Sequence, residues 1–215
     1  DEESHRHAHG VSKDLKDALR EAIELIGNEA AEQIVAQRKT AGETAYQTRE
    51  GKSALDANQL SLECLRYMYR LLFLFYIEAR PDLGFAPMKS EAYRRGYSLE
   101  SLRELELMPL TNDEEKEGYF LFESLNLLFR LVYQGTPYSD LSSSEGEYAR
   151  DFDMLPVKTQ LFDPDSTPML GKVRFTNETL QRVIQLMSLS REGQGKTRRG
   201  RISYAQLGIN QLGAV

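Results

Sequence analysis

The stretch of residues 56–80 constrains the fold of this chain more than any other. Its apolar residues recur at the spacing of an α-helix and cover most of its sides: Leu60, Cys64, Leu65, Met68, Leu71, Leu72, Phe75 and Ala79. Pro81 ends this helix, because proline lacks the amide hydrogen that a further turn would need. A helix that is apolar on several sides has to be covered by other elements, so the pattern predicts the central helix of a bundle.

Charged residues interrupt the same helix, at Glu63, Arg66, Arg70 and Glu78. They leave no uncharged stretch approaching the roughly 20 residues that a membrane-spanning helix needs, so we expect no membrane partner. Glu63 precedes Arg66 by three positions and Arg66 precedes Arg70 by four. Residues at these spacings are neighbours on a helix surface, which predicts an ion-paired ladder along one edge.

Shorter amphipathic patterns predict helices on both sides of the central one. The first begins after Ser12 and continues to about Arg38, and Gly27-Asn28 could interrupt it. The others follow Pro81, and they are residues 98–108, a longer helix that follows the capping-box sequence 111–114 and ends at Gly135, and residues 177–193 with Asn177 as the cap.

These elements predict a mainly α-helical fold with few or no strands and three regions. Residues 1–11 lack periodicity and read as a disordered tail, whereas residues 12–135 form the helical bundle. Residues 136–215 combine a loop-rich segment with the last helix. Because residues 136–172 contain four prolines and a run of three serines, we expect an irregular layer packed over the helices there.

Composition limits the partners and the location of the protein. The chain has 27 Lys and Arg against 33 Asp and Glu, a formal charge of −6, so any contact with nucleic acid has to be local. Cys64 is the single cysteine and cannot form an intramolecular disulfide, and no signal-peptide pattern is present. These features predict a cytoplasmic protein.

Two short motifs suggest phosphate or metal chemistry but lack the context for it. Gly195-Lys196-Thr197 has the end of a phosphate-binding loop, yet Ser190 stands where the first glycine is required, and a helix precedes the motif instead of a strand. A nuclease would need Glu50-Gly51-Lys52 or Glu114-Glu115-Lys116 on neighbouring strands. The second of these lies at a predicted helix start, where the helix dipole explains the acids.

Other nucleophiles and metal ligands also point away from catalysis. His5, His7 and His9 could bind a transition metal, but a mobile tail gives them no fixed surroundings. Cys64 lies among apolar residues and is best interpreted as a buried small side chain. Since no histidine lies outside the tail, Ser-His and Cys-His hydrolases are excluded, and we assign no catalytic, cofactor-binding or metal-binding residue.

Residues 191–201 are the one strongly cationic segment, with five basic residues, one acid and three glycines. Such a segment is either a solvated loop or a contact with the phosphates of a nucleic acid. The candidate phosphate-binding residues are Lys196, Arg198, Arg199 and Arg201. After it, Leu207, Ile209, Leu212 and Val215 are still apolar, so we expect the polypeptide to continue beyond Val215.

Several stretches resemble one family. They are residues 65–80 (LRYMYRLLFLFYIEAR), 97–103 (YSLESLR), 161–164 (LFDP) and 202–204 (ISY), followed by Leu207-Gly208 and Leu212-Gly213. In this order they resemble the helical region N-terminal to the catalytic domain of large bacterial DNA adenine methyltransferases. That family comprises the type IIG restriction-modification enzymes and the phage-defence methylases of BREX and DISARM systems.

The resemblance implies a parent protein that transfers a methyl group from S-adenosylmethionine to adenine N6 in double-stranded DNA, after flipping the base. This chain has no glycine-rich cofactor loop and no Asn/Asp-Pro-Pro-Tyr/Phe motif, so the fragment itself is expected to be inactive. We expect a helical connector that joins the rest of the same polypeptide and faces DNA. The alternatives are a stand-alone helical adaptor for protein partners, without a role at DNA, and, less favoured, a small hydrolase or nuclease.

Overall fold

The structure is a computed structural model that describes residues 2–42, 55–136, 152–189 and 200–207, with the side chains of residues 2–13 and 206 left outside the description. Within these ranges it is mainly helical and has no sheet, which confirms the predicted fold class. The α-helices are α1 (Glu2–Thr40), α2 (Ala57–Ala79), α3 (Glu91–Gly96), α4 (Leu99–Arg103), α5 (Asp113–Glu117), α6 (Phe120–Gln134) and α7 (Asn177–Ser188). Short 3-10 helices are η1 (Pro81–Leu83), η2 (Glu104–Leu107), η3 (Pro164–Ser166), η4 (Leu170–Lys172) and η5 (Tyr204–Gln206).

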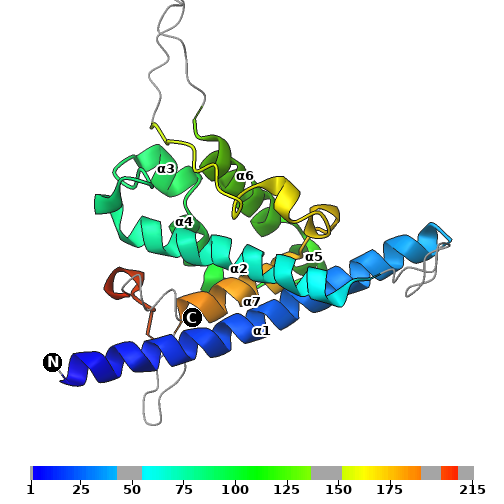
Figure 1. The fold of residues 1–215 in the computed structure, drawn as a ribbon, viewed down its shortest axis with the longest axis horizontal. Coiled ribbons are helices and arrows are strands. Elements are labelled where there is room, and N and C mark those ends of the chain that lie inside the picture. Colours follow the sequence, from blue (N-terminus) through cyan, green and yellow to red (C-terminus); the bar gives the residue numbers. More distant parts are fainter. Residues whose placement is uncertain (1, 43–54, 137–151, 190–199, 208–215) are drawn as a thin grey trace, which may run out of the picture.

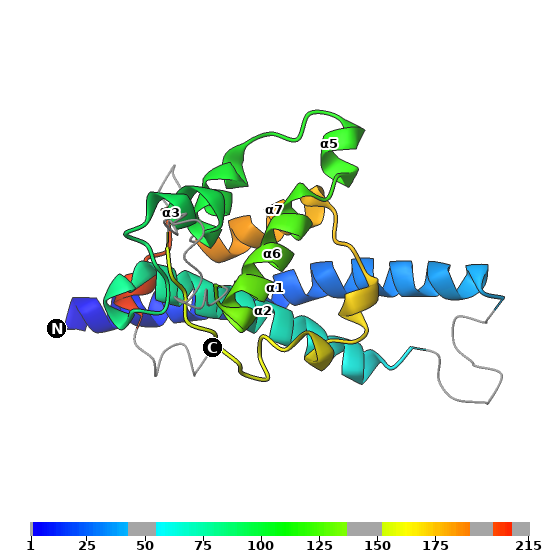
Figure 2. The same cartoon turned by 90° about the horizontal axis from the view of Figure 1, so that it is seen from above.

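The two longest helices, α1 and α2, pack against each other, and α7 lies along α1 (Figure 1). Helices α3, α4 and α6 gather on the other side of α2 from α1, and Figure 2 shows α5 at the edge of the molecule. Helix α4 connects the two groups because it contacts α2, α6 and α7. The core therefore lies around α2, as the apolar pattern of residues 56–80 predicts.

Helix α1 buries the stripe that its sequence predicts. The buried residues follow one another at spacings of three or four, and they are Leu15, Leu19, Ala22, Ile26, Ala30 and Ile34. The helix passes through Gly27 without a break. A Cβ atom at Gly27 would lie 3.8 Å from Cys64 Sγ, an ordinary contact, so packing against α2 does not require the glycine.

The beginning of α1 differs from the prediction. The helix starts at Glu2, whereas we expected residues 1–11 to be a tail and Ser12 to be the cap. Residues 2–11 contain no proline, and once a helix is nucleated each further turn adds hydrogen bonds at little cost. Apolar periodicity shows which part of a helix packs, and it gives no sign of a polar extension.

Glu63, Arg66 and Arg70 of α2 bind the loop layer and do not form the ladder expected along the helix. The Glu63 carboxylate accepts hydrogen bonds from the amides of Met169 and Leu170, at 2.8 and 3.0 Å. Arg66 donates to the carbonyl of Ser166, and Arg70 donates to four acceptors between residues 161 and 167. Glu63 and Arg70 are buried, so these charge-assisted bonds offset the loss of water around both groups.

The described part of residues 136–172 is the irregular layer that the prolines and serines predict. It begins at Gly135, whose φ of 72° is a conformation that favours glycine. A Cβ atom there would lie 2.7 Å from the carbonyl oxygen of Met154. The close approach of the backbone at Gly135 to the backbone at Met154 therefore also requires glycine. Further along, Phe162 inserts between the rings of Phe73 and Phe129, with centroids 5.4 and 6.1 Å away.

Asn177 has a different role from the one predicted. The cap of α7 is Thr176, whose hydroxyl accepts from the amide of Thr179. Asn177 Oδ1 instead accepts from the amide of Leu121 at 3.0 Å, at the start of α6, and its Nδ2 donates to the carbonyl of Glu115. Tyr119, the residue before α6, makes no capping bond through its own side chain, so Asn177 stabilises the beginning of a helix 56 residues away.

Candidate nucleic-acid interface

The described residues that flank the cationic segment lie side by side. Lys196, Arg198 and Arg199 lie outside the described residues, and Arg201 lies within them. Leu189, directly after α7, forms an antiparallel bridge with Arg201. The amide of Ile202 also donates to the carbonyl of Ser188 at 2.8 Å, so both ends of residues 190–200 are fixed side by side.

Arg103 of α4 binds the backbone on both sides of residues 190–200. Its Nη2 donates to the carbonyls of Ser188 and Ile202, at 3.0 and 2.9 Å. The side chain comes from α4, which Ser98 caps by accepting from the amide of Ser101. Arg103 is buried with its guanidinium over the ring of Phe75, 5.5 Å from the centroid. A buried arginine with this geometry holds two backbone segments in register through charge-assisted bonds.

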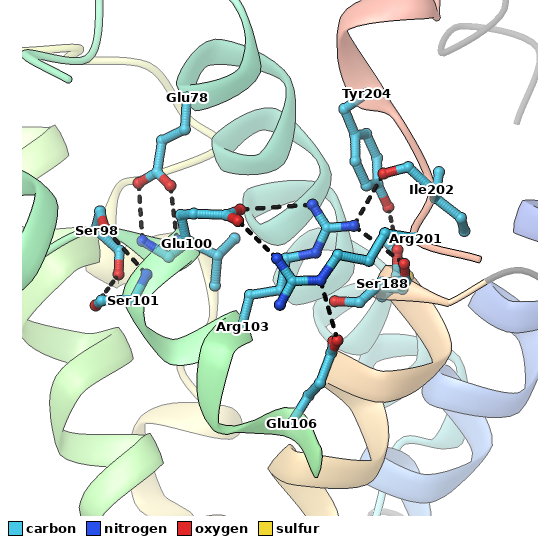
Figure 3. Close-up of polar contacts among 12 residues, drawn as sticks. Glu78, Ser98, Glu100, Ser101, Arg103, Glu106, Ser188, Arg201, Ile202 and Tyr204 are labelled. Carbon is cyan, nitrogen blue, oxygen red and sulfur yellow. Dashed lines mark hydrogen bonds and ion pairs between the residues drawn. The ribbon is translucent and has the colours of Figure 1, made fainter. Parts of the chain in front are cut away.

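Arg201 contacts acidic side chains of the same molecule (Figure 3). Its Nη1 lies 3.1 Å from a carboxylate oxygen of Glu100, and its Nε lies 3.5 Å from Oε1 of Glu106. Glu100 also lies 3.5 Å from Nη1 of Arg103, so one carboxylate connects the two arginines. Of the four predicted phosphate-binding residues, Arg201 is thus the one whose charge is balanced within the described structure.

Burying the carboxylate of Glu106 costs free energy, and the ion pair with Arg201 offsets part of this cost. It is 1% exposed, and neither of its carboxylate oxygens has a hydrogen-bond partner among the described residues. In the same parts of the chain, Ser188 Oγ and Arg103 Nε also lack one. A buried polar group without a partner costs about 1–3 kcal/mol, and more if it is charged, so the ion pair with Arg201 is the main compensation for burying Glu106.

Tyr204 fixes the segment that follows Arg201. Its ring stacks on Phe75 with centroids 4.7 Å apart and an angle of 7° between the planes. Its hydroxyl donates to the carbonyl of Met187 at 2.7 Å, and burial raises the pKa of this hydroxyl. Residues 200–207 therefore belong to the core between α2 and α7. Beside them lies a cavity of about 310 Å³ lined by Glu78, Arg103 and Tyr204, among others.

Glu78 closes the other side of this cavity and caps α4. It accepts hydrogen bonds from the amides of Leu99 and Glu100, at 2.8 and 2.9 Å, and from the hydroxyl of Tyr93 at 2.9 Å. Burial raises the pKa of Glu78 to about 7, although the three hydrogen bonds act in the opposite direction. The carboxyl group therefore changes its charge near neutral pH while it holds the helix that carries Arg103.

The remaining sequence candidates agree with their structural interpretations where the structure describes them. Cys64 is fully buried, and burial followed by the charge of Glu63 raises its pKa to about 11, which leaves a thiol that is a poor nucleophile. Glu114-Glu115-Lys116 lies in α5, and the amide of Glu115 donates to the capping side chain of Asn112. Glu50-Gly51-Lys52 lies outside the described residues.

The phosphate-loop and metal candidates are described only in part. Gly195-Lys196-Thr197 lies outside the described residues, and the element before it is the helix α7, not a strand. The side chains of His5, His7 and His9 are also outside the description. Among the side chains that the structure does describe, no group of three or more His, Cys, Asp or Glu residues is arranged to hold a metal ion.

The sequence did not reveal Glu78, Arg103 and Glu106 as members of one cluster. Glu100 and Arg103 lie three apart on one helix, but Ser188 and Ile202 are 85 and 99 positions away from Arg103. The one available signal was a density of charged residues within a short amphipathic helix, which normally indicates a solvated face.

No protein-family model matches this chain, and neither a curated protein nor a solved structure is similar enough to match it. Across the described ranges, none of the helices is both long and apolar enough to cross a bilayer. The geometry of the chain's own residues, together with the family resemblance of its sequence, is what supports a function.

Proposed function

We propose that this chain is a helical connector of a bacterial DNA adenine-N6 methyltransferase or restriction-modification protein and that its cationic segment lies along DNA phosphates. The proposal places the chain in the cytoplasm, within a longer polypeptide. Methyl transfer and the binding of S-adenosylmethionine belong to another part of that polypeptide, so the chain alone is inactive. The sequence resemblance supplies the family.

The observation that carries the connector role is the way residues 200–207 are held. Arg103 binds both sides of the cationic segment, and Tyr204 is stacked on Phe75 and bonded to α7. A connector transmits a fixed distance and angle only if the chain leaves it from a rigid point. Residues 200–207 meet this requirement because their anchors come from α2, α4 and α7.

The DNA role rests on where the basic residues begin and end. Both ends of residues 190–200 are fixed at one place, and Arg201 at the base is neutralised by Glu100 and Glu106. Four of the five basic residues remain, and three of them, Lys196, Arg198 and Arg199, are the predicted phosphate contacts. Contacts from such residues position a protein on DNA without reading its sequence.

The affinity for duplex DNA, measured as a function of salt concentration, tests the DNA role. Each phosphate contact contributes about 0.9 to the slope of log K against log salt, so Arg198→Ala with Arg199→Ala is expected to reduce the slope by about 2. Arg20→Ala with Arg130→Ala removes the same charge from exposed positions on α1 and α6 and is the matched control. If both double variants change the slope equally, the cationic segment is not the DNA contact.

The connector role is tested in the parent polypeptide, where Tyr204→Ala is expected to slow adenine methylation of duplex DNA without changing the affinity for S-adenosylmethionine. A reading frame that stops at Val215 would favour the adaptor over the connector. The adaptor has one structural observation in its favour, which is the groove between α4 and α6, lined by both apolar and charged side chains.

A further inference from the structure

A buried carboxylate holds the beginning of α4 against α2 (Figure 3). Glu78 of α2 is 7% exposed. Its two oxygens accept hydrogen bonds from the amides of Leu99 and Glu100, and one of them also accepts from the hydroxyl of Tyr93. These donors are neutral, and Glu78 forms no ion pair within the described ranges. Without an opposite charge beside it, the ionised carboxyl group keeps much of the free-energy cost of leaving water.

The cavity of about 310 Å³ beside Glu78 connects this carboxyl group with the surface. Ser203 and Ala205 also line the cavity, and both residues are exposed. A space of this size is large enough for several water molecules. A proton can therefore reach or leave Glu78 through the cavity while the rest of the molecule stays folded.

The surroundings of Glu78 decide how its charge responds to pH. The other titratable side chains that contact Glu78, line its cavity or pair with those that do are Tyr93 of α3, Glu100 and Arg103 of α4, and Arg201 and Tyr204. Burial raises the pKa of both tyrosines, so they stay neutral. Glu100 pairs with both arginines, at 3.5 and 3.1 Å. Burial has the largest effect on Glu78 and raises its pKa to about 7, against the three hydrogen bonds.

The same short helix carries the contact with Glu78 at its beginning and Arg103 at its end. Helix α4 has five residues, so it has little stability of its own and depends on its contacts with the rest of the fold. Arg103 donates to the carbonyls of Ser188 and Ile202. A movement of α4 away from α2 therefore places Glu78 in water and also weakens the hold of Arg103 on residues 200–207.

We propose that Glu78 and α4 form a pH-dependent clasp, in which loss of the proton from Glu78 favours an open form where α4 has left α2 and Arg103 has released residues 200–207. Water surrounds Glu78 in the open form and stabilises its charge. Rising pH therefore opens the clasp, and falling pH closes it. The clasp belongs to the chain itself, so it acts whether or not the cationic segment binds DNA.

Hydrogen exchange of the complete 215-residue chain tests the clasp, with each rate corrected for the chemical exchange rate at that pH. The reporters are the amides of Leu99 and Glu100, which donate to Glu78, and of Ile202, which donates to the carbonyl of Ser188. Because the closed form binds the proton more tightly, the opening constant of all three amides is expected to rise about 25-fold from pH 5.5 to pH 8. A rise of less than about twofold, or one that is absent at Ile202, overturns the proposal.

Two variants show whether Glu78 is the group responsible. Glu78→Gln cannot ionise, so its opening constants are expected to stay within about twofold over the same pH range. Glu114→Gln, at an exposed position on α5, is the matched control and should keep the full rise. Tyr93→Phe keeps the buried ring and removes one donor to the charged carboxylate, so the rise should extend to higher pH than in the unchanged chain. The same pH dependence in all four proteins would overturn the clasp.

Urea separates opening of the clasp from complete unfolding, which exposes Glu78 as well. Opening of α4 alone exposes little surface, so about 1 M urea should change the opening constants of Leu99 and Ile202 less than about twofold. Complete unfolding, measured from the circular dichroism of the same protein, should respond by more than about tenfold. An equal response of both would show that α4 has no separate open form.

Discussion

The carboxyl group of Glu78 is buried at the start of α4 and surrounded by three hydrogen-bond donors. Burial raises its pKa from the ordinary value of 4.5 to about 7. The folded protein therefore binds this proton more tightly than the unfolded chain does. The resulting stabilisation is complete below pH 4.5 and is lost as the pH rises through about 7.

This shift makes the effect of Glu78→Gln depend on pH. Gln cannot ionise, so relative to the unchanged protein the variant is expected to gain about 2 kcal/mol of unfolding free energy between pH 5 and pH 8. Urea unfolding of both proteins at the two pH values measures the difference. Glu114→Gln, at an exposed position on α5, should show no such gain. The explanation fails if the two variants respond to pH alike.

At the scale of residues, the sequence predicted burial better than bonding partners. Cys64 is the buried small side chain that its apolar neighbours indicated. Glu63, Arg66 and Arg70 stand at the spacing of an ion-paired ladder, yet each of them bonds to backbone groups 91 to 107 positions away. Helical spacing predicts which residues are neighbours on the same helix. It does not predict contacts with a loop that lies about a hundred residues further along the chain and packs over that helix.

At the scale of elements, Asn177 joins three helices, because it begins α7, caps α6 and donates to the carbonyl of Glu115 in α5. Asn177→Ala is expected to lower the unfolding free energy by about 1–2 kcal/mol, since the Leu121 amide loses its acceptor. Asn177→Asp keeps that acceptor and loses only the donor to Glu115, so it should cost less. Denaturant unfolding of the three proteins gives the comparison, and equal costs for Ala and Asp would show that the cap on α6 contributes nothing.

Most helices were predictable because their cores are periodic. The central helix was expected at residues 56–80 and is Ala57–Ala79, and the irregular layer after Gly135 was indicated by its prolines. Other boundaries differ from the prediction: the long helix expected after residues 111–114 is divided into α5 and α6, and the helix expected over residues 177–193 ends at Ser188. Two further differences have a physical reason in the structure. The N-terminal turns of α1 carry no apolar stripe, and Thr176 takes the capping position of α7 because Asn177 is used by α6.

At the scale of the whole molecule, residues 200–207 are part of the core that α2 and α7 form. Tyr204→Ala is expected to lower the unfolding free energy by about 3–5 kcal/mol, because it removes a buried ring and leaves the Met187 carbonyl without its donor. Tyr69→Ala is the control, since Tyr69 is 38% exposed on α2, and it should cost less than about 1 kcal/mol.

Hydrogen exchange shows where the effect of Tyr204→Ala is felt. Faster exchange is expected at the amide of Ile202, which donates to the carbonyl of Ser188, and at the amide of Leu189, which donates to the carbonyl of Gln185 in α7. Unchanged protection at both amides, together with unchanged stability, would mean that residues 200–207 only lie on the surface of the core.

The sequence predicted only part of the candidate nucleic-acid interface. The cluster of basic residues at 191–201 stands out in an acidic chain, and it led to Lys196, Arg198, Arg199 and Arg201 as one set. In the structure Arg201 pairs with Glu100 and Glu106, whereas Lys196, Arg198 and Arg199 lie outside the described residues. The charge pattern along the chain does not predict these ion pairs, because Glu100 in α4 and Glu106 in η2 lie about a hundred positions before Arg201.

The bridge between Leu189 and Arg201 also affects which changes in sequence and length the protein can tolerate. The residues on either side of 190–200 are held together by the bridge between Leu189 and Arg201 and by the hydrogen bonds of Arg103 to the carbonyls of Ser188 and Ile202. Doubling the length of a segment closed in this way costs only about 0.6 kcal/mol of closure entropy. Evolution or an engineer can therefore exchange this stretch for a longer, shorter or differently charged one and leave the described helices undisturbed.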